Sequence, residues 1–335
     1  MTPRARIIPV FVPHLGCPHR CVFCDQKRIT GASAPAGPEQ VLAALAAAAG
    51  REKETELAFY GGTFAALPGR EQEALLAAAG PFVDLGGSIR LSTRPDSLTA
   101  EKADFLAARG VKTIELGCQS MDDGVLRLSG RGHRAADTET AARLVRERGI
   151  RLILQMMTGL PGDTFEKSLE TARRLADLGP DGVRIYPTVI LRGTPLHEMW
   201  RAGTYEEHTV EEAVRWCAGI LPVFEERGIP VIRLGLNPTE DLSGGEAAGG
   251  AYHPAFGELV ASFRFLERER ELLRQAGSVS SATFLVHPSR LSAAVGHRGS
   301  NRRALEEEFP GVRIAFRGSE NMKRDGAAVE IERPE

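Results

Sequence analysis

The sequence lacks the features that mark membrane-spanning and secreted proteins. No apolar run approaches the roughly 18–20 residues with which a helix crosses a membrane. The short apolar run Ile7–Val12 is not followed by an Ala-x-Ala cleavage site, so we expect no secretory signal. The net charge of −2 over 335 residues provides no general field that attracts nucleic acid, so such binding would need a local patch. We therefore expect a cytoplasmic protein with no membrane partner.

Cysteine is also scarce, with five residues, too few for a disulfide framework and typical of a reducing compartment. Cys17, Cys21 and Cys24 share one loop with the spacing C-x3-C-x2-C. No second cysteine pair or Cys/His cluster follows that would complete a four-ligand zinc site. A cubane iron–sulfur cluster normally takes four cysteines, so three leave one iron open to a non-protein ligand. We interpret Cys118 and Cys217 as small buried apolar residues.

Short apolar runs alternate with longer helical patterns. Strands are predicted at Ile7–Val12, Leu57–Tyr60, Ile89–Ser92, Thr113–Leu116, Arg151–Met157 and Val183–Val189. Helices are predicted at Pro38–Ala49, Glu71–Ala79, Ala100–Arg109, Ala136–Arg148 and Phe165–Leu178. This alternation indicates a parallel sheet with crossover helices, and without a dinucleotide fingerprint it favours an open barrel over a Rossmann fold. In such barrels the chemistry lies at the carboxyl ends of the strands.

Residues suited to ligand binding follow several of these strands. Gly61 and Gly62 end the second strand, and their missing side chains let the backbone approach a ligand closely. Arg94 follows the third strand and can form a charge-assisted bond with a carboxylate. The alternatives are an ordinary turn for the glycines and a solvated loop residue for the arginine. Further polar candidates near strand ends are Thr63, Gln119, Arg131 and Gln155.

The cysteine loop, with Phe23 directly before its third cysteine, resembles the signature of the radical S-adenosylmethionine (SAM) superfamily. The resemblance implies a partial (β/α)6 TIM-like barrel and a [4Fe–4S] cluster ligated by Cys17, Cys21 and Cys24. It implies that SAM binds the open iron and is cleaved reductively to methionine and a 5′-deoxyadenosyl radical, which abstracts hydrogen from the substrate. It also implies a low-potential electron donor such as flavodoxin or ferredoxin.

Within that superfamily, a set of motifs between residues 5 and 260 resembles the radical SAM half of the Elongator catalytic subunit. The motifs are Gly-Gly-Thr-Phe, Ser-Thr-Arg-Pro-Asp, Glu-Leu-Gly-Cys-Gln-Ser, Arg-Gly-His, Gly-Leu-Pro-Gly, Arg-Ile-Tyr-Pro-Thr, Arg-Gly-Thr and Arg-Leu-Gly-Leu. The resemblance implies SAM contacts from Phe23, Gly61, Gly62, Thr63, Arg94, Gln119, Arg131 and Gln155. It makes Tyr186, on the sixth strand, the candidate catalytic residue facing substrate.

Three departures qualify the likeness to Elongator. Elongator subunits have a longer cysteine spacing, and they carry an acetyltransferase domain after the barrel that we do not expect in this chain. Many relatives have aspartate at the position of Gln155, although an amide can still hydrogen-bond ribose hydroxyls.

The pattern changes after Leu191. A helix is predicted at Val210–Arg227, a possible strand at Val231–Leu234, a loop at 237–251 and a long charged helix at Pro254–Gln275. We divide the chain into a radical SAM barrel at 1–235, a linker and bridging helix at 236–280, and a small α+β domain at 281–335.

The last domain carries a G-x-x-G loop between two predicted helices, with a predicted hairpin after them, and this pattern resembles the KH fold. In KH domains such a loop lies against the backbone of single-stranded nucleic acid. The candidate RNA-binding residues are Gly296, His297, Arg298, Gly299, Arg302 and Arg303. The alternative is a structural turn, because G-x-x-G alone is a weak signal.

Together these motifs predict a radical SAM enzyme that modifies RNA, either transfer RNA or ribosomal RNA. One alternative is a radical SAM enzyme acting on a small metabolite such as a tetrapyrrole, which the basic G-x-x-G loop disfavours. The other is a non-catalytic iron–sulfur RNA-binding protein, which the set of SAM motifs disfavours.

Overall fold

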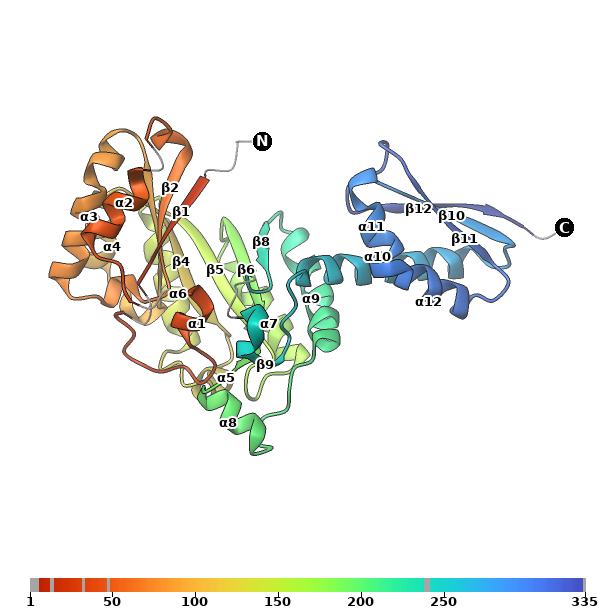
Figure 1. The fold of residues 1–335 in the computed structure, drawn as a ribbon, viewed down its shortest axis with the longest axis horizontal. Helices are drawn as coiled ribbons and strands as arrows, with labels where there is room; N and C mark the ends of the chain where they lie inside the picture. Colours follow the sequence, from red (N-terminus) through yellow and green to blue (C-terminus); the bar gives the residue numbers. More distant parts are fainter. Residues whose placement is uncertain (1–5, 13–14, 32–33, 47–48, 238–241, 334–335) are drawn as a thin grey trace. The chain divides into compact units, whose positions relative to one another are not determined.

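The computed structural model describes residues 6–12, 15–31, 34–46, 49–237 and 242–333. The first five residues, part of the segment in which no secretory signal was expected, lie outside that range. The chain forms two compact units, one of residues 1–213 with 220–254 and one of residues 214–219 with 255–335 (Figure 1). No helix within the described ranges is long and apolar enough to cross a membrane.

The first unit is built on a curled parallel sheet of seven strands, in the order β1-β2-β3-β4-β5-β6-β8. The strands are β1 (Arg6–Phe11), β2 (Thr55–Tyr60), β3 (Ser88–Thr93), β4 (Val111–Gln119), β5 (Arg151–Thr158), β6 (Gly182–Pro187) and β8 (Val231–Leu234). Among the described strands β1 and β8 are the two edges, so the barrel is open. The predicted partial barrel is therefore confirmed, and the possible strand at Val231–Leu234 is confirmed as β8, which joins the sheet as its seventh strand.

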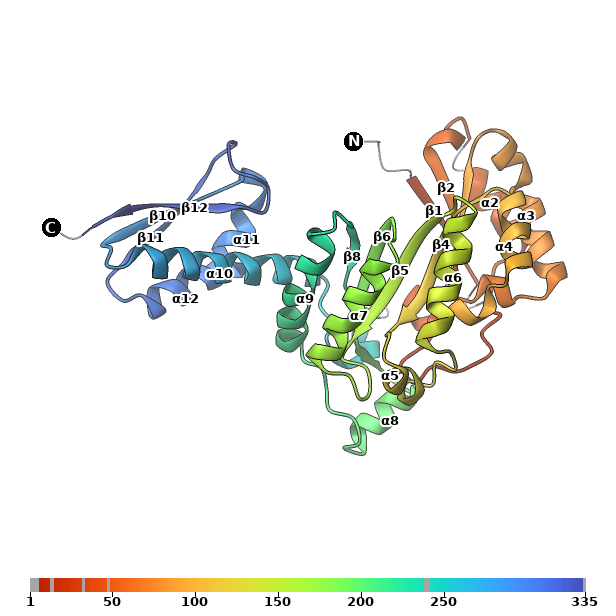
Figure 2. The same ribbon diagram turned by 180° about the vertical axis from the view of Figure 1, so that it is seen from behind.

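Helices cover the convex face of the sheet, where Figure 2 shows α4, α6 and α7 alongside the strands. The helices are α1 (Gln26–Thr30), α2 (Pro38–Ala46), α3 (Gly69–Asp84), α4 (Ala100–Ala108), α5 (Asp123–Leu128), α6 (Ala135–Glu147), α7 (Phe165–Asp177), α8 (Pro195–Arg201) and α9 (Val210–Glu225). Short 3-10 turns lie at Glu52–Glu54, Phe64–Ala66 and Pro95–Ser97. Gly110, Gly149 and Gly179 follow α4, α6 and α7 with φ of 84°, 63° and 62°, which is the left-handed conformation that ends a helix.

One strand prediction was wrong. The sixth strand was expected to continue to Val189, but β6 ends at Pro187 and the next residues form β7 (Val189–Leu191). β7 pairs antiparallel with β9 (Ala247–Gly250), which lies in the segment predicted as a loop. Four alanine and glycine residues carry no strand periodicity, so the pairing was not visible in the sequence. Gly250 is required there because a Cβ would lie 2.7 Å from the carbonyl oxygen of Thr188.

Side chains alternate sharply between the two faces of the sheet, as the pleat of a strand requires. One face is apolar and packs under the helices, with Leu57, Leu91, Ile114 and Ile185 all fully buried. The other, concave face, which we call the lumen, carries charged and polar residues. These are Glu56, Tyr60, Arg90, Thr113, Glu115, Arg184 and Tyr186.

The second unit has its own core. Its elements are α10 (Phe256–Ala276), β10 (Ser281–Val286), α11 (Leu291–Val295), α12 (Ser300–Glu308), β11 (Arg313–Gly318) and β12 (Ala327–Glu332), with 3-10 turns at Pro288–Arg290 and His297–Gly299. Phe284, Leu305 and Ile314 pack together with Leu273 of α10. The two helices around the G-x-x-G loop are confirmed.

The predicted hairpin in this unit was wrong. The strand order is β11-β10-β12, with β10 parallel to β11 and antiparallel to β12. The crossover through α11 and α12 brings β11 back parallel to β10 on one side. The connection from Gly318 to Ala327 then carries the chain to the opposite edge, so the last two strands never meet.

Glu269 generates a prediction for the stability of this unit. Its side chain is fully buried in α10, and neither carboxylate oxygen has a hydrogen-bond partner among the described residues. Burial raises the pKa of this carboxyl to about 8. The folded state therefore holds a proton that the unfolded state releases at a pH near 4–5, so stability should fall as the pH rises towards 8.

Replacing Glu269 by Gln should remove this dependence and stabilise the protein at pH 8 by on the order of a few kcal/mol. Thermal unfolding between pH 5.5 and 8.5 measures the pH dependence of stability. The control is Glu271→Gln, on the exposed side of the same helix. Parallel pH profiles for Glu269→Gln and the wild type would show that the carboxyl does not titrate as described.

Candidate cluster and cofactor site

The cysteine loop follows β1 and folds tightly before α1. The backbone N–H of Cys24 donates to the carbonyl of Cys21 at 3.2 Å, and Cys21 is buried while Cys17 and Cys24 are half-buried. Burial and the nearby thiols of Cys21 and Cys17 raise the pKa of Cys24 to about 12. Cys21 and Cys17 therefore lie close enough to Cys24 to disfavour its thiolate, and a positively charged centre beside it would relieve that repulsion.

Each cysteine sulfur has a polar neighbour. The Sγ of Cys17 lies 3.2 Å from the Oγ1 of Thr63, and the Sγ of Cys24 accepts from the Nε2 of Gln26 at 3.2 Å. The Sγ of Cys21 accepts from the Nη1 of Arg131, also at 3.2 Å. The structure thus brings Thr63 and Arg131, two residues predicted to bind cofactor, to the three predicted metal ligands.

In the part of the chain that the structure describes, no three His, Cys, Asp or Glu side chains gather closely enough to hold a single metal ion. In a cluster each thiolate binds a different iron, so its ligands lie farther apart than those around one ion.

The glycine pair after β2 packs directly against the cysteine loop. A Cβ on Gly62 would lie 2.5 Å from the carbonyl oxygens of both Val12 and Leu15, so no larger residue fits without moving the backbone. The N–H of Thr63 donates to that same Leu15 carbonyl at 3.0 Å. The observed reason for Gly62 is thus close packing of two backbone segments. A contact of Gly61 and Gly62 with SAM stays a prediction.

Two buried arginines and a histidine lie near the loop with unused nitrogen atoms. Arg94 donates to both carboxylate oxygens of Asp96, at 3.0 and 2.8 Å, so it is already paired, and its Nη1 has no partner among the described residues. Arg131 donates from Nη2 to the carbonyl of Gly117. Within the same described ranges, the Nε of Arg131 and the Nδ1 of His133 have no hydrogen-bond partner either. Buried polar atoms are rarely left unsatisfied, so this group suits a polar ligand.

His133 was part of a motif but received no role from the sequence. Burial, together with the charges of Arg131 and Arg94, lowers the pKa of its imidazole to about 3, so the ring is neutral. Its Nε2 lies 3.2 Å from the carbonyl oxygen of Cys118. A neutral ring beside two guanidinium groups adds a polar contact without adding positive charge.

The two glutamines predicted to contact SAM, Gln119 and Gln155, hydrogen-bond to each other. The Nε2 of Gln155 donates to the Oε1 of Gln119 at 3.4 Å, across neighbouring strands β4 and β5. Gln119 has a φ of 68°, an unusual value for a residue other than glycine, beside a register shift in that pair of strands. Backbone in sparsely populated conformations is concentrated at functional sites, which agrees with a ligand-binding role at this strand end.

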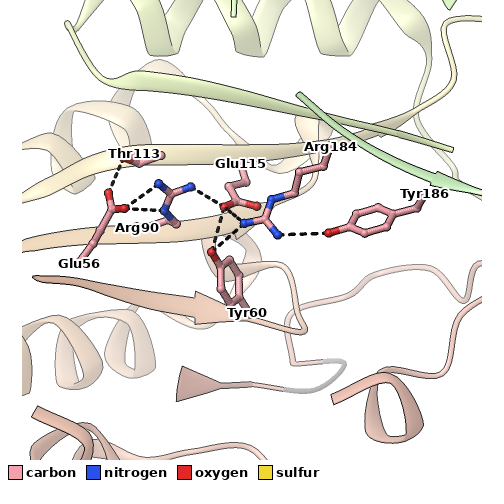
Figure 3. Close-up of polar contacts among 7 residues, drawn as sticks. All are labelled: Glu56, Tyr60, Arg90, Thr113, Glu115, Arg184 and Tyr186. Atoms are coloured by element: carbon pink, nitrogen blue, oxygen red, sulfur yellow. Dashed lines mark hydrogen bonds and ion pairs between the residues drawn. The ribbon is translucent and has the colours of Figure 1, made fainter. Parts of the chain in front are cut away.

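The lumen holds a second polar group that the sequence analysis missed (Figure 3). The Oε1 of Glu115 accepts from Arg90 Nη1 at 2.7 Å, from Arg184 Nη2 at 2.8 Å and from the hydroxyl of Tyr60 at 3.0 Å. Arg90 also pairs with Glu56 at 2.6 Å. Burial and the charge of Glu115 raise the pKa of Tyr60, which keeps the phenol protonated as a donor.

Tyr186 connects this network to the cysteine loop. Its hydroxyl accepts from the Nη1 of Arg184 at 3.2 Å, and its ring packs against the apolar cluster that contains Cys21 and Phe23. The candidate catalytic residue is thus held between the charged lumen and the predicted cluster ligands. The signal for the network was present in the sequence, because Arg90, Glu115 and Arg184 each stand between two apolar residues of a strand.

Comparison with known protein families agrees with this geometry. A model of the radical SAM superfamily matches residues 11–175, and a model of a radical SAM C-terminal domain matches residues 180–264. The chain belongs to the radical SAM superfamily. The protein is therefore a radical SAM enzyme, and the predicted cofactors, a [4Fe–4S] cluster and SAM, are those of its superfamily.

Its sequence relatives include tRNA-modifying proteins. A tRNA uridine(34) acetyltransferase of Methanocaldococcus infernus is 33% identical over 138 residues, which cover 39% of this chain and 26% of the relative. Elongator complex protein 3 of Saccharomyces cerevisiae is 32% identical over 136 residues, 40% of this chain and 24% of the relative. An uncharacterised protein of Methanocaldococcus jannaschii is 32% identical over 213 residues, 59% and 65% of the two chains. This radical SAM enzyme thus matches about a quarter of the length of its named relatives.

Solved structures show the same fold. The archaeal Methanocaldococcus infernus Elp3 with an N-terminal deletion has a TM-score of 0.61 and 22% identity, covering 80% of this chain and 63% of that one. Methylornithine synthase has a TM-score of 0.52 and 15% identity, covering 69% and 72% of the two chains. These likenesses confirm the predicted radical SAM barrel, and the Elongator-like motifs are confirmed as a sequence similarity.

The first prediction for this site concerns the cluster. Replacing any one of Cys17, Cys21 or Cys24 by Ala should abolish the iron content and visible absorbance of anaerobically reconstituted protein, because in the predicted site each thiolate ligates one iron. Cys217→Ala, a buried cysteine on α9, is the matched control and should retain both. One equivalent of stable zinc without iron absorbance in the wild type would contradict the assignment.

The second prediction concerns Glu115. Replacement by Gln leaves the buried guanidinium of Arg90 and the half-buried one of Arg184 with one carboxylate, Glu56, between them, and it should lower the free energy of unfolding by about 3 kcal/mol or more. Chemical denaturation measures the change. The control is Glu139→Gln, which removes an exposed ion pair with Arg174 and should cost less than about 1 kcal/mol. Similar losses in the two variants would mean that the lumen network does not hold the strands together.

Proposed function

We propose that this radical SAM enzyme modifies an RNA substrate, either transfer RNA or ribosomal RNA. The observation that carries the proposal is the exposed basic G-x-x-G loop in the second unit, in a chain whose first unit has the superfamily fold. The similarity to relatives named as tRNA uridine(34) acetyltransferases supports an RNA substrate. Because the matched segments span only part of those relatives, acetyl transfer itself is not carried over.

In this proposal the first unit holds the cofactors. Cys17, Cys21 and Cys24 ligate the cluster, and SAM is held by Phe23, Gly61, Gly62, Thr63, Arg94, Gln119, Arg131 and Gln155. A bound cluster supplies the electron that cleaves SAM, after reduction by a low-potential donor such as flavodoxin or ferredoxin. Arg131 stabilises the thiolate of Cys21 by donating to its sulfur, and Tyr186 faces the substrate from β6.

The G-x-x-G loop has a backbone shape that only particular residues allow. Gly296 and Gly299 have φ of 80° and 78°, and a Cβ on Gly296 would lie 2.4 Å from the Oγ of Ser300. Arg298 also has a positive φ, 51°, which is uncommon for a residue with a side chain. His297 and Arg298 are exposed at the tip. A narrow loop with two basic side chains can lie close to a phosphate backbone.

Asn301 keeps this loop rigid. It is buried, and its Nδ2 donates to the carbonyl of Ser262 on α10 at 2.9 Å and to that of Ala294 on α11 at 3.0 Å. The two remaining basic residues are partly engaged within the unit. Arg303 donates to the carbonyl of Arg298 at 2.7 Å, and the guanidinium of Arg302 lies 5.6 Å from the ring centre of Phe316. A preorganised loop loses little freedom when it binds, which favours affinity.

The double replacement of His297 and Arg298 by Asp tests the RNA-binding role. Carboxylates would then face phosphates, so affinity for bulk transfer RNA should fall about tenfold or more at moderate salt, with a shallower salt dependence. Fluorescence anisotropy over a salt series measures both quantities. The matched control is Lys323→Asn with Arg324→Asp, which also changes the charge by −3 when histidine is neutral, at an exposed adjacent pair in the same unit.

SAM cleavage without RNA should be unchanged in the His297/Arg298 variant, since the loop belongs to a different compact unit from the cysteine loop. Equal RNA affinity in this variant and the wild type would remove the loop from the proposal. That result would favour a small metabolite as the substrate.

A further inference from the structure

Two arginines on neighbouring strands line the lumen beyond Tyr186. Arg233 on β8 is the register partner of Arg184 on β6, just after a register shift at Val183 and Arg184. Residues paired in register on parallel strands project from the same face of a sheet. Both side chains are half-buried. In each of them the Nε atom is shielded from solvent and has no hydrogen-bond partner among the described residues.

The charges around this pair do not balance. Glu115 compensates Arg90 and Arg184 at 2.7 and 2.8 Å, and Glu56 adds a second carboxylate beside Arg90. Within the described ranges Arg233 makes no ion pair, so three guanidinium groups face two carboxylates. A partly buried positive charge next to another of the same sign is costly unless an anion approaches it. Among the described residues, the lumen therefore has one carboxylate fewer than the three arginines need for charge balance.

We propose that Arg184 and Arg233 bind an oxyanion of the substrate. Guanidinium groups present planar N–H donors that match the oxygens of phosphate and carboxylate groups. The oxyanion has two possible sources, the phosphodiester of a nucleic acid or the carboxylate of a small substrate. Assigning it to the substrate rests on the proposed function, whereas the binding itself does not.

The location of Arg184 and Arg233 suits them to orienting a substrate relative to the cysteine loop. Arg184 donates to the hydroxyl of Tyr186, and Tyr186 packs against the apolar cluster that contains Cys21 and Phe23. An anion held by the two arginines would therefore fix one end of the substrate at a set place relative to the loop that carries the predicted cluster ligands. A substrate fixed in this way presents one C–H bond, rather than several, to the radical.

Thermal unfolding of the reconstituted protein tests the site without turnover. The probes are dimethyl phosphate and acetate, each compared with chloride at the same ionic strength. A probe at about ten times its dissociation constant should raise Tm by about 2–3 °C. In Arg233→Gln this rise should disappear, and Arg233→Lys, which keeps the charge but loses the planar donors, should retain only part of it.

The control is Arg143→Gln on α6, whose side chain is 66% exposed, and it should respond to the probes as the wild type does. In chloride alone Arg233→Gln should melt no lower than the wild type, because it removes an unbalanced charge. A response to dimethyl phosphate alone identifies the phosphodiester source, a response to acetate alone the carboxylate source, and either supports the proposal.

Four results would overturn the site. They are no shift with either probe, equal shifts in the wild type and Arg233→Gln, a lower Tm of Arg233→Gln in chloride, and loss of the shift when SAM is saturating. Equal shifts in the wild type and Arg233→Gln would mean an adventitious ion only. Loss of the shift at saturating SAM would assign the arginines to SAM binding. Release of 5′-deoxyadenosine by the wild type is measured separately, so a failure of this site leaves the SAM chemistry standing.

Discussion

A single buried carboxylate oxygen connects most of the polar interior of this enzyme. Oε1 of Glu115 accepts from Arg90, Arg184 and Tyr60, which stand on three other strands of the sheet. A charge removed from water has to be balanced nearby, so these side chains fix one another's positions more strictly than apolar packing would. Through Arg184 the same network positions Tyr186, which packs against the apolar cluster that contains Cys21 and Phe23. The lumen therefore adjoins the predicted cofactor site at Tyr186.

Most of the barrel could be predicted because apolar runs and glycine helix ends are local signals. The strands β2 to β5 and the glycines after α4, α6 and α7 fall where the pattern placed them. The errors arise where pairing is decided by distant segments. β9 consists of Ala247 to Gly250, which have no strand pattern of their own and are ordered by β7. The hairpin in the second unit failed for the same reason, because β10, far earlier in the chain, separates β11 from β12.

The candidate site was only partly predictable for a similar reason. Cys17, Cys21 and Cys24 lie within eight residues, so their spacing alone indicated a metal centre. Arg94 was expected to be available for a ligand carboxylate. Nothing in the sequence revealed that its Nε and Nη2 already donate to Asp96, two residues later. The unbalanced charge of Arg233 was invisible as well, because it depends on which residues on other strands face it.

The central claim is that radical chemistry on this barrel modifies RNA. Nucleoside mass spectrometry of total RNA from a deletion strain tests it most directly. The account predicts that one modified nucleoside disappears from transfer or ribosomal RNA and returns with the wild-type gene but not with the Cys21→Ala variant. An unchanged nucleoside profile in the deletion strain, under conditions in which the wild-type protein is expressed, would contradict it.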